Sequence, residues 1–93
     1  MQVEVLAKKL GMRPEELIRI SIERYLHDEL VRVEAQIAEI YAKYGVKSPE
    51  ELKRKIEKGD VLEHPAWEDL IDLRNLLEIR KKLLEVIEVA RKS

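Results

Sequence analysis

Apolar residues recur every three or four positions along most of the chain, which is the spacing of an amphipathic helix. The pattern predicts four helices, short–long–short–long, over residues 3–10, 14–44, 49–58 and 65–91. A glycine stands at the end of the first three predicted helices and a proline at the start of the last three, positions that suit each residue. The predicted fold class is therefore all-α: a small bundle of four helices with the two long helices antiparallel.

The second predicted helix carries an unusually long apolar stripe. Leu17, Ile18, Ile22, Tyr25 and Leu26 share one side, and a heptad seam continues through Leu30, Val33, Ile37, Ile40 and Tyr44. At a rise of ~1.5 Å per residue, a helix of this length would extend for about 46 Å, more than the width of a small domain. A bend near His27 or Asp28 would shorten it.

The sharpest local signal is Ser48-Pro49-Glu50-Glu51. Ser48 can accept a hydrogen bond from the backbone amide of Glu51, and the Glu51 side chain can reach back to the backbone amide of Ser48. Pro49 stands at the first helical position, where its missing N–H does no harm. This capping box predicts the start of the third helix.

The last predicted helix carries two adjacent apolar stripes. Leu70, Leu73, Leu77, Leu84 and Ile87 form one, and Leu76, Ile79, Leu83, Val86 and Ala90 form the other. Two stripes make a face wider than one partner helix covers. We therefore expect this helix to pack on the second helix and also on another subunit, giving a homodimer. The predicted partner or dimer interface consists of Trp67, Leu76, Ile79, Leu83, Val86, Ile87 and Ala90.

Length and composition limit the class of protein. The 93 residues suit a single helical domain, residues 1–93, with a head (residues 3–26) and a helical hairpin with a short intervening helix (residues 27–93). Charged residues make up 40%, yet the net charge is only −1, so the chain lacks the surplus of positive charge that is typical of general nucleic-acid-binding proteins.

Cysteine is absent, and no apolar run is long enough to span a membrane, so we expect a cytoplasmic protein. One Asn, two Gln and many charged residues suggest a thermophilic source.

The head has the spacing of a helix-turn-helix. Ala7 supplies a small residue, Gly11 a turn, and Leu17 and Ile20 the anchors of a second helix. Two packed helices with no DNA role explain the same pattern equally well. Up to Tyr25 the head has five Lys or Arg and four Glu, and Glu15 and Glu16 would face DNA phosphates. The candidate nucleic-acid contacts are Lys8, Lys9, Arg13 and Arg19.

Two stretches carry a family resemblance. Residues 6–26, LAKKLGMRPEELIRISIERYL, resemble the helix–turn–helix half of ribbon-helix-helix antitoxins. Residues 34–73, with Tyr44-Gly45, Ser48-Pro49-Glu50-Glu51-Leu52 and Trp67-Glu68-Asp69-Leu70, resemble the tail of small archaeal antitoxin-like proteins. The resemblance implies a dimer, a toxin-like protein partner, and a DNA-reading strand, for which only residues 1–5 are available.

Catalytic and metal-binding patterns are weak. His27 and His64 lack the spacing that places two ligands on one helix face, so solvated surface histidines are expected. Ser21 has no apparent base, and no phosphate-binding loop occurs. We expect no cofactor, no metal and no enzyme activity. Tyr41, Tyr44 and Trp67 suit either a capped bundle end or an exposed anchor patch.

Three functional hypotheses follow from these patterns. The leading one is a non-enzymatic helical interaction module, antitoxin-like or regulatory, that acts by protein–protein contact. The second is a helix-turn-helix DNA-binding transcriptional regulator, and the third is an orphan structural bundle that associates only with itself.

Overall fold

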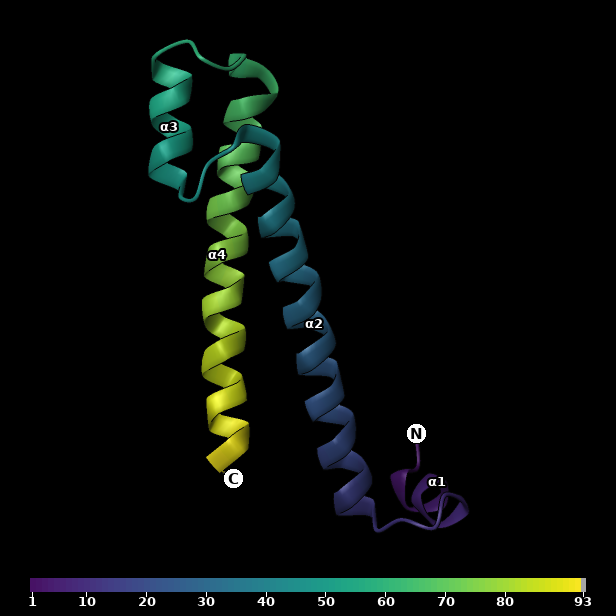
Figure 1. Ribbon diagram of the computed structural model, residues 1–93. Helices are drawn as coiled ribbons and strands as arrows, with labels where there is room; N and C mark the ends of the chain where they lie inside the picture. Colours follow the sequence, from purple (N-terminus) through teal and green to yellow (C-terminus); the bar gives the residue numbers. More distant parts are fainter. Residues whose placement is uncertain (93) are drawn as a thin grey trace.

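The computed structural model describes residues 1–92, which form four helices: α1 (Val3–Lys9), α2 (Pro14–Tyr44), α3 (Pro49–Glu57) and α4 (Glu63–Lys92). The two long helices, α2 and α4, run antiparallel, α3 packs beside α4 at one end, and α1 lies at the far end of α2 (Figure 1). The predicted all-α class and the short–long–short–long order are confirmed. Ser93, the last residue of the predicted domain, lies outside the described residues.

The helix ends lie at or close to the glycine and proline positions that predicted them. α2 starts at Pro14 and ends before Gly45, whose φ of 63° lies in the left-handed region that favours glycine. Ser48 Oγ accepts from the Glu51 backbone N–H at 3.2 Å, and Glu51 Oε2 accepts from the Lys47 backbone N–H at 3.1 Å. The carboxylate thus reaches back one residue further than a standard capping box would place it.

The long helices differ in regularity. α2 is a single helix of 31 residues that passes through His27 and Asp28 without interruption. α4 contains a non-helical residue, His64, with φ −111° and ψ 125°, and the His64–Pro65 peptide bond is cis. The regular part of α4 therefore begins at Pro65, as the sequence predicts, and the turn before it is offset by a kink.

The hydrophobic core lies at the α3 end of the hairpin. Its buried members come from α2, α3, α4 and the turn after α2: Val33, Ile37, Val46, Leu52, Ile56, Ala66, Leu70 and Leu73. Outside this cluster, the buried apolar residues of the described chain are Ala7 and Leu26. Because the molecule measures 60 × 23 × 18 Å, a core at one end leaves the opposite end thinly packed.

Candidate interaction surfaces

In the head, α1 packs against α2. Ala7 on α1 is fully buried, and its carbonyl accepts from the Met12 backbone N–H at 2.9 Å. Gly11, with φ 68°, turns the chain between the two helices. The small residue and the glycine thus occupy the places that the sequence pattern assigned to them, in which a side chain without bulk allows two backbones to approach.

An apolar groove runs between α1 and the start of α2. It has a volume of about 380 Å³. Seven of its eight lining residues are apolar, and Ser21 is the polar exception; the others are Met1, Val3, Leu6, Leu10, Leu17, Ile18 and Ile22. Leu10 is 63% exposed and Ile22 is 48% exposed, so these side chains line an open groove instead of a closed core.

The head also contains the free end of the long apolar seam of α2. We define the seam as Ile18, Ile22, Leu26, Leu30, Val33 and Ile37. The last turns of α4 (Ile87, Ala90 and Arg91) share a groove of about 330 Å³ with residues 23–30 of α2, so residues 14–22 extend past the end of α4. Figure 1 shows the two helices separating toward this end.

The interface predicted on α4 divides into covered and open positions. Leu76, Leu83 and Trp67 are partly buried and pack against the core. Ile87 and Ala90 are partly buried in the groove beside α2. Ile79 and Val86 are the two that are about half exposed, at 46% and 49%. Hydrophobic spacing identified the apolar residues of α4 correctly. However, residues of both stripes, not of one alone, pack in or against the core.

The candidate nucleic-acid contacts Lys8, Lys9, Arg13 and Arg19 are all exposed. The Arg19 guanidinium pairs with Glu23 Oε1 at 3.4 Å along the same helix. No residue from 1 to 5 forms a strand, since Val3 already begins α1. The strand on which ribbon-helix-helix proteins depend is therefore not formed in this region of the chain.

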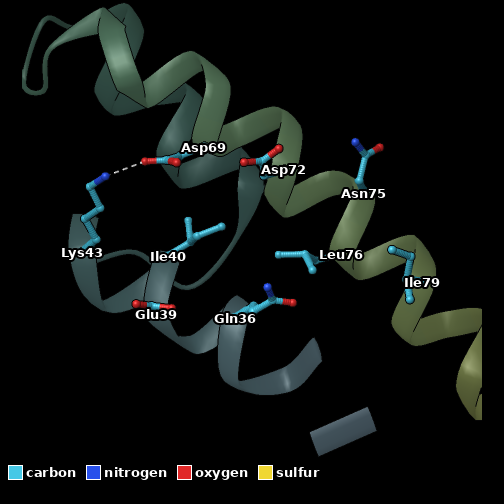
Figure 2. A pocket seen from close by; sticks show the side chains of 9 residues that line it. All are labelled: Gln36, Glu39, Ile40, Lys43, Asp69, Asp72, Asn75, Leu76 and Ile79. Carbon is cyan, nitrogen blue, oxygen red and sulfur yellow. Dashed lines mark hydrogen bonds and ion pairs between the residues drawn. The ribbon is translucent and has the colours of Figure 1, made fainter. Parts of the chain in front are cut away.

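A polar groove of about 490 Å³ lies between α2 and α4. Figure 2 shows its lining side chains, which come from both helices: Gln36, Glu39, Ile40, Lys43, Asp69, Asp72, Asn75, Leu76 and Ile79. Ile40, Leu76 and Ile79 supply apolar surface, and Lys43 bridges to Asp69 at one end of the groove. Within residues 1–92, no three or more His, Asp or Glu side chains gather where they could hold a metal ion.

Asp69 forms a polar clamp between the two long helices. Its carboxylate Oδ2 accepts from Lys43 Nζ at 2.8 Å and from the Tyr44 hydroxyl. The hydrogen bond from Lys43, then that from Tyr44, lowers the pKa of Asp69, and the same contact raises the pKa of Lys43. Burial, followed by the contact with Asp69, raises the pKa of Tyr44. From the sequence, Tyr44 suited either a capped bundle end or an exposed anchor patch. Its acidic partner could not be found there, because the two residues are 25 positions apart.

Removing the Tyr44 hydroxyl tests this clamp. We expect Tyr44→Phe to lower the free energy of unfolding by about 1 kcal/mol, since Asp69 then loses one charged hydrogen bond in a partly buried setting. Tyr25→Phe is a matched control: its hydroxyl also donates to a carboxylate, Glu29, at 3.3 Å, but the residue is 62% exposed. Urea unfolding measures both variants, and equal losses would contradict a clamp specific to Tyr44.

The clamp also predicts a dependence of stability on pH. Folding lowers the pKa of Asp69, whose usual value is 3.8, so its contribution is present above about pH 4 and is lost as the pH falls through the lower folded value. The Asp69→Asn variant should show a smaller loss of stability between about pH 5 and pH 2 than the wild type in urea unfolding. The same loss in both proteins would assign the acid sensitivity to other carboxylates.

Both histidines are exposed and each faces an acidic neighbour. His64 Nδ1 lies 2.7 Å from Glu68 Oε1, and His27 Nδ1 lies 3.4 Å from Asp28 Oδ1. Each pair joins one histidine to one carboxylate, and the contact between His64 and Glu68, four residues apart, was not among those expected from the sequence. Within residues 1–92, no helix combines the length and the apolar character that crossing a membrane requires.

The fold and its surfaces define an all-α helical protein with an antiparallel hairpin and a two-helix head. Residues 1–92 match the model of the family described as Uncharacterized protein MJ0235 family, and the chain belongs to that family. It is 33% identical over 73 residues to Uncharacterized protein MJ0235 from Methanocaldococcus jannaschii, covering 78% of this chain and 89% of the relative. No solved structure matches the chain.

Proposed function

We propose that this protein is a non-enzymatic helical interaction module, antitoxin-like or regulatory, that acts by protein–protein contact. The observation that carries the proposal is the distribution of apolar side chains. Fifteen large hydrophobic residues of the described chain are at least 42% exposed, whereas ten hydrophobic residues, two of them alanines, are buried. Single exposed apolar residues are ordinary on a protein surface, but contiguous ones mark sites of contact.

The side of α4 that carries Ile79 and Val86 supplies the surface for a protein partner. Ile79 and Val86 are seven residues apart, so they lie on one face two helical turns from each other. A partner of matching chemistry is a protein that presents an amphipathic helix or an apolar groove, as in helix-in-groove recognition.

Co-expression with the products of neighbouring genes tests the antitoxin-like role. If a neighbouring gene encodes a toxin-like protein that arrests growth, this chain should restore growth, and Ile79→Glu with Val86→Glu should abolish the rescue. The matched control is Val31→Glu with Ile71→Glu, which adds the same charge at exposed positions on α2 and α4. Absence of any neighbouring product that arrests growth, or rescue by the α4 variant, would refute the antitoxin-like proposal.

A helix-turn-helix DNA-binding regulator is the second candidate, favoured by the buried Ala7 and the left-handed Gly11 at the predicted turn. A regulator should be retained on duplex DNA at low salt, with retention falling steeply as salt rises. Arg13→Ala with Arg19→Ala should then weaken binding. On the leading proposal we expect no retention, and binding that is lost in the double variant would instead establish the regulator.

A further inference from the structure

We infer that the polar groove between α2 and α4 receives a basic side chain, arginine or lysine, from an amphipathic helix of a partner protein. The inference rests on the proposed function, because it names the chemistry of the partner for a surface that includes Ile79. It goes beyond that proposal by assigning the choice of partner to the acidic groove beside the apolar contact.

The groove carries more negative charge than its own chain neutralises. Three carboxylates and one ammonium group line it. The ammonium group is that of Lys43, which pairs with Asp69 at 2.8 Å, and the Tyr44 hydroxyl donates to the same carboxylate. Within residues 1–92, Glu39 and Asp72 form no ion pair and no side-chain hydrogen bond. The groove thus keeps two uncompensated negative charges, one from each long helix (Figure 2).

The groove also gathers most of the carboxamide side chains of the chain. The sequence contains one Asn and two Gln, and two of these three, Asn75 and Gln36, line the groove. Neither side chain forms a hydrogen bond within the described residues. A carboxamide oxygen accepts from a guanidinium or ammonium group, and its N–H donates to a carbonyl. The two amides therefore add neutral acceptors and donors beside the two carboxylates.

Apolar surface completes the groove. Ile40 and Leu76 are partly buried against the core, and Ile79 is about half exposed. Arginine and lysine combine an apolar stem with a charged end, so the stem can lie on these residues while the end reaches a carboxylate. A guanidinium also forms paired hydrogen bonds with a carboxylate, which makes arginine the better fit.

The same charges disfavour other occupants. In a two-fold contact between two copies, the groove would meet itself and bring like carboxylates together. A nucleic acid would place its phosphates against the same negative charge. A metal ion lacks a ligand set among the described residues. A basic amphipathic helix complements the charge of the groove, and its apolar face can continue onto Ile79 and Val86, as in helix-in-groove recognition.

Binding of two matched peptides tests the inference. One is a designed amphipathic helix of leucine and alanine with arginine beside its apolar face, and the other has glutamate in place of every arginine. Fluorescence anisotropy should show that the wild type binds the arginine peptide roughly tenfold more tightly or better, since complementary charge selects partners. Glu39→Gln with Asp72→Asn should remove most of this preference.

The matched control is Glu57→Gln with Asp60→Asn. It makes the same two chemical changes at exposed carboxylates outside the groove lining, so it should retain the preference of the wild type. Circular dichroism should show equal helix content for the wild type and both variants, because neither pair of substitutions alters a buried residue.

NMR signals of the side-chain amides locate the contact in the unaltered protein. Asn75 is the single asparagine of the chain, and Gln36 can be compared with Gln2, the other glutamine, which lies in front of α1. The arginine peptide should shift the signals of Asn75 and Gln36 and leave those of Gln2 in place. This measurement decides the location even if a variant fails to fold.

Three results would overturn the inference: equal affinity for the two peptides, equal effects of the two pairs of substitutions, or binding that leaves the Asn75 signals unchanged. Spermidine that binds alone and excludes the arginine peptide would also overturn it, by assigning the groove to a small polycation. Growth rescue through Ile79 and Val86 without a preference for the arginine peptide would refute this inference alone. A preference without growth rescue would refute the antitoxin-like role and leave the groove a site for a basic helix.

Discussion

Leu70→Ala should lower the free energy of unfolding by about 2–5 kcal/mol, the range measured when a buried leucine is truncated. Leu70 is fully buried on α4 and belongs to the core cluster that also contains Leu52 and Leu73, on α3 and α4. Removing its side chain leaves a cavity where the helices meet, and among the described residues only Ala7 and Leu26 are buried outside this core. For a chain of this length the whole stability is about 5–14 kcal/mol, so the variant should be close to unfolding.

Leu84→Ala is the matched control for this prediction. Leu84 lies on the same helix, and the substitution makes the same chemical change, but the residue is 48% exposed. We expect a loss below about 1 kcal/mol, because less apolar surface leaves water and no closed cavity forms. Thermal unfolding should show a much larger fall in Tm for Leu70→Ala, at about 4–8 °C per kcal/mol. Similar losses for the two variants would contradict a core confined to the α3 end.

Helix positions were predictable because they depend on local chemistry. Pro14 and Pro49 begin helices, and Ser48 caps the third, since each residue acts on the backbone within one helical turn. The apolar periodicity likewise indicated that α2 and α4 would pair along Val33 and Leu73. These features required no knowledge of distant contacts, and the structure bears them out.

The length over which α2 and α4 pair was not predictable from local chemistry. The position at which α4 ends beside α2 depends on the turns on both sides of α3 and on the kink at His64. A periodic apolar pattern encodes none of these features. The sequence analysis therefore placed the open apolar surface on α4. The structure partly buries Leu76 and Leu83, leaves Ile79 and Val86 about half exposed, and also exposes Ile18 and Ile22.

For surface residues, too, local features were predictable from the sequence and contacts between helices were not. The exposed positions of Lys8 and Arg19 could be expected from the polar face of an amphipathic helix. The clamp of Lys43, Tyr44 and Asp69 could not, because it joins two helices whose register is a tertiary property. An acidic residue opposite a half-buried tyrosine leaves no signal in a single sequence.

Gly45→Ala should lower the free energy of unfolding by about 1–2 kcal/mol through backbone conformation. Gly45 has φ 63° and ends α2, and the Val46 backbone N–H then donates to the Tyr41 carbonyl at 3.0 Å. A Cβ added at Gly45 would lie 3.7 Å from Lys55 Nζ, an ordinary contact, so steric overlap contributes little. The cost should instead come from holding an L-residue in the left-handed region.

The Gly45→Asn variant tests whether the loss of stability in Gly45→Ala comes from the backbone conformation or from the replacement of glycine by any side chain. Asparagine tolerates the left-handed conformation better than alanine, so it should recover a substantial part of the stability lost in Gly45→Ala. Urea unfolding with unchanged m-values would show that both variants retain the native fold. If asparagine and alanine were equally destabilising, the conformational explanation would fail. The turn would then depend on close contacts around Val46 and the Lys55 ammonium group, which donates to the Tyr44 carbonyl at 2.7 Å.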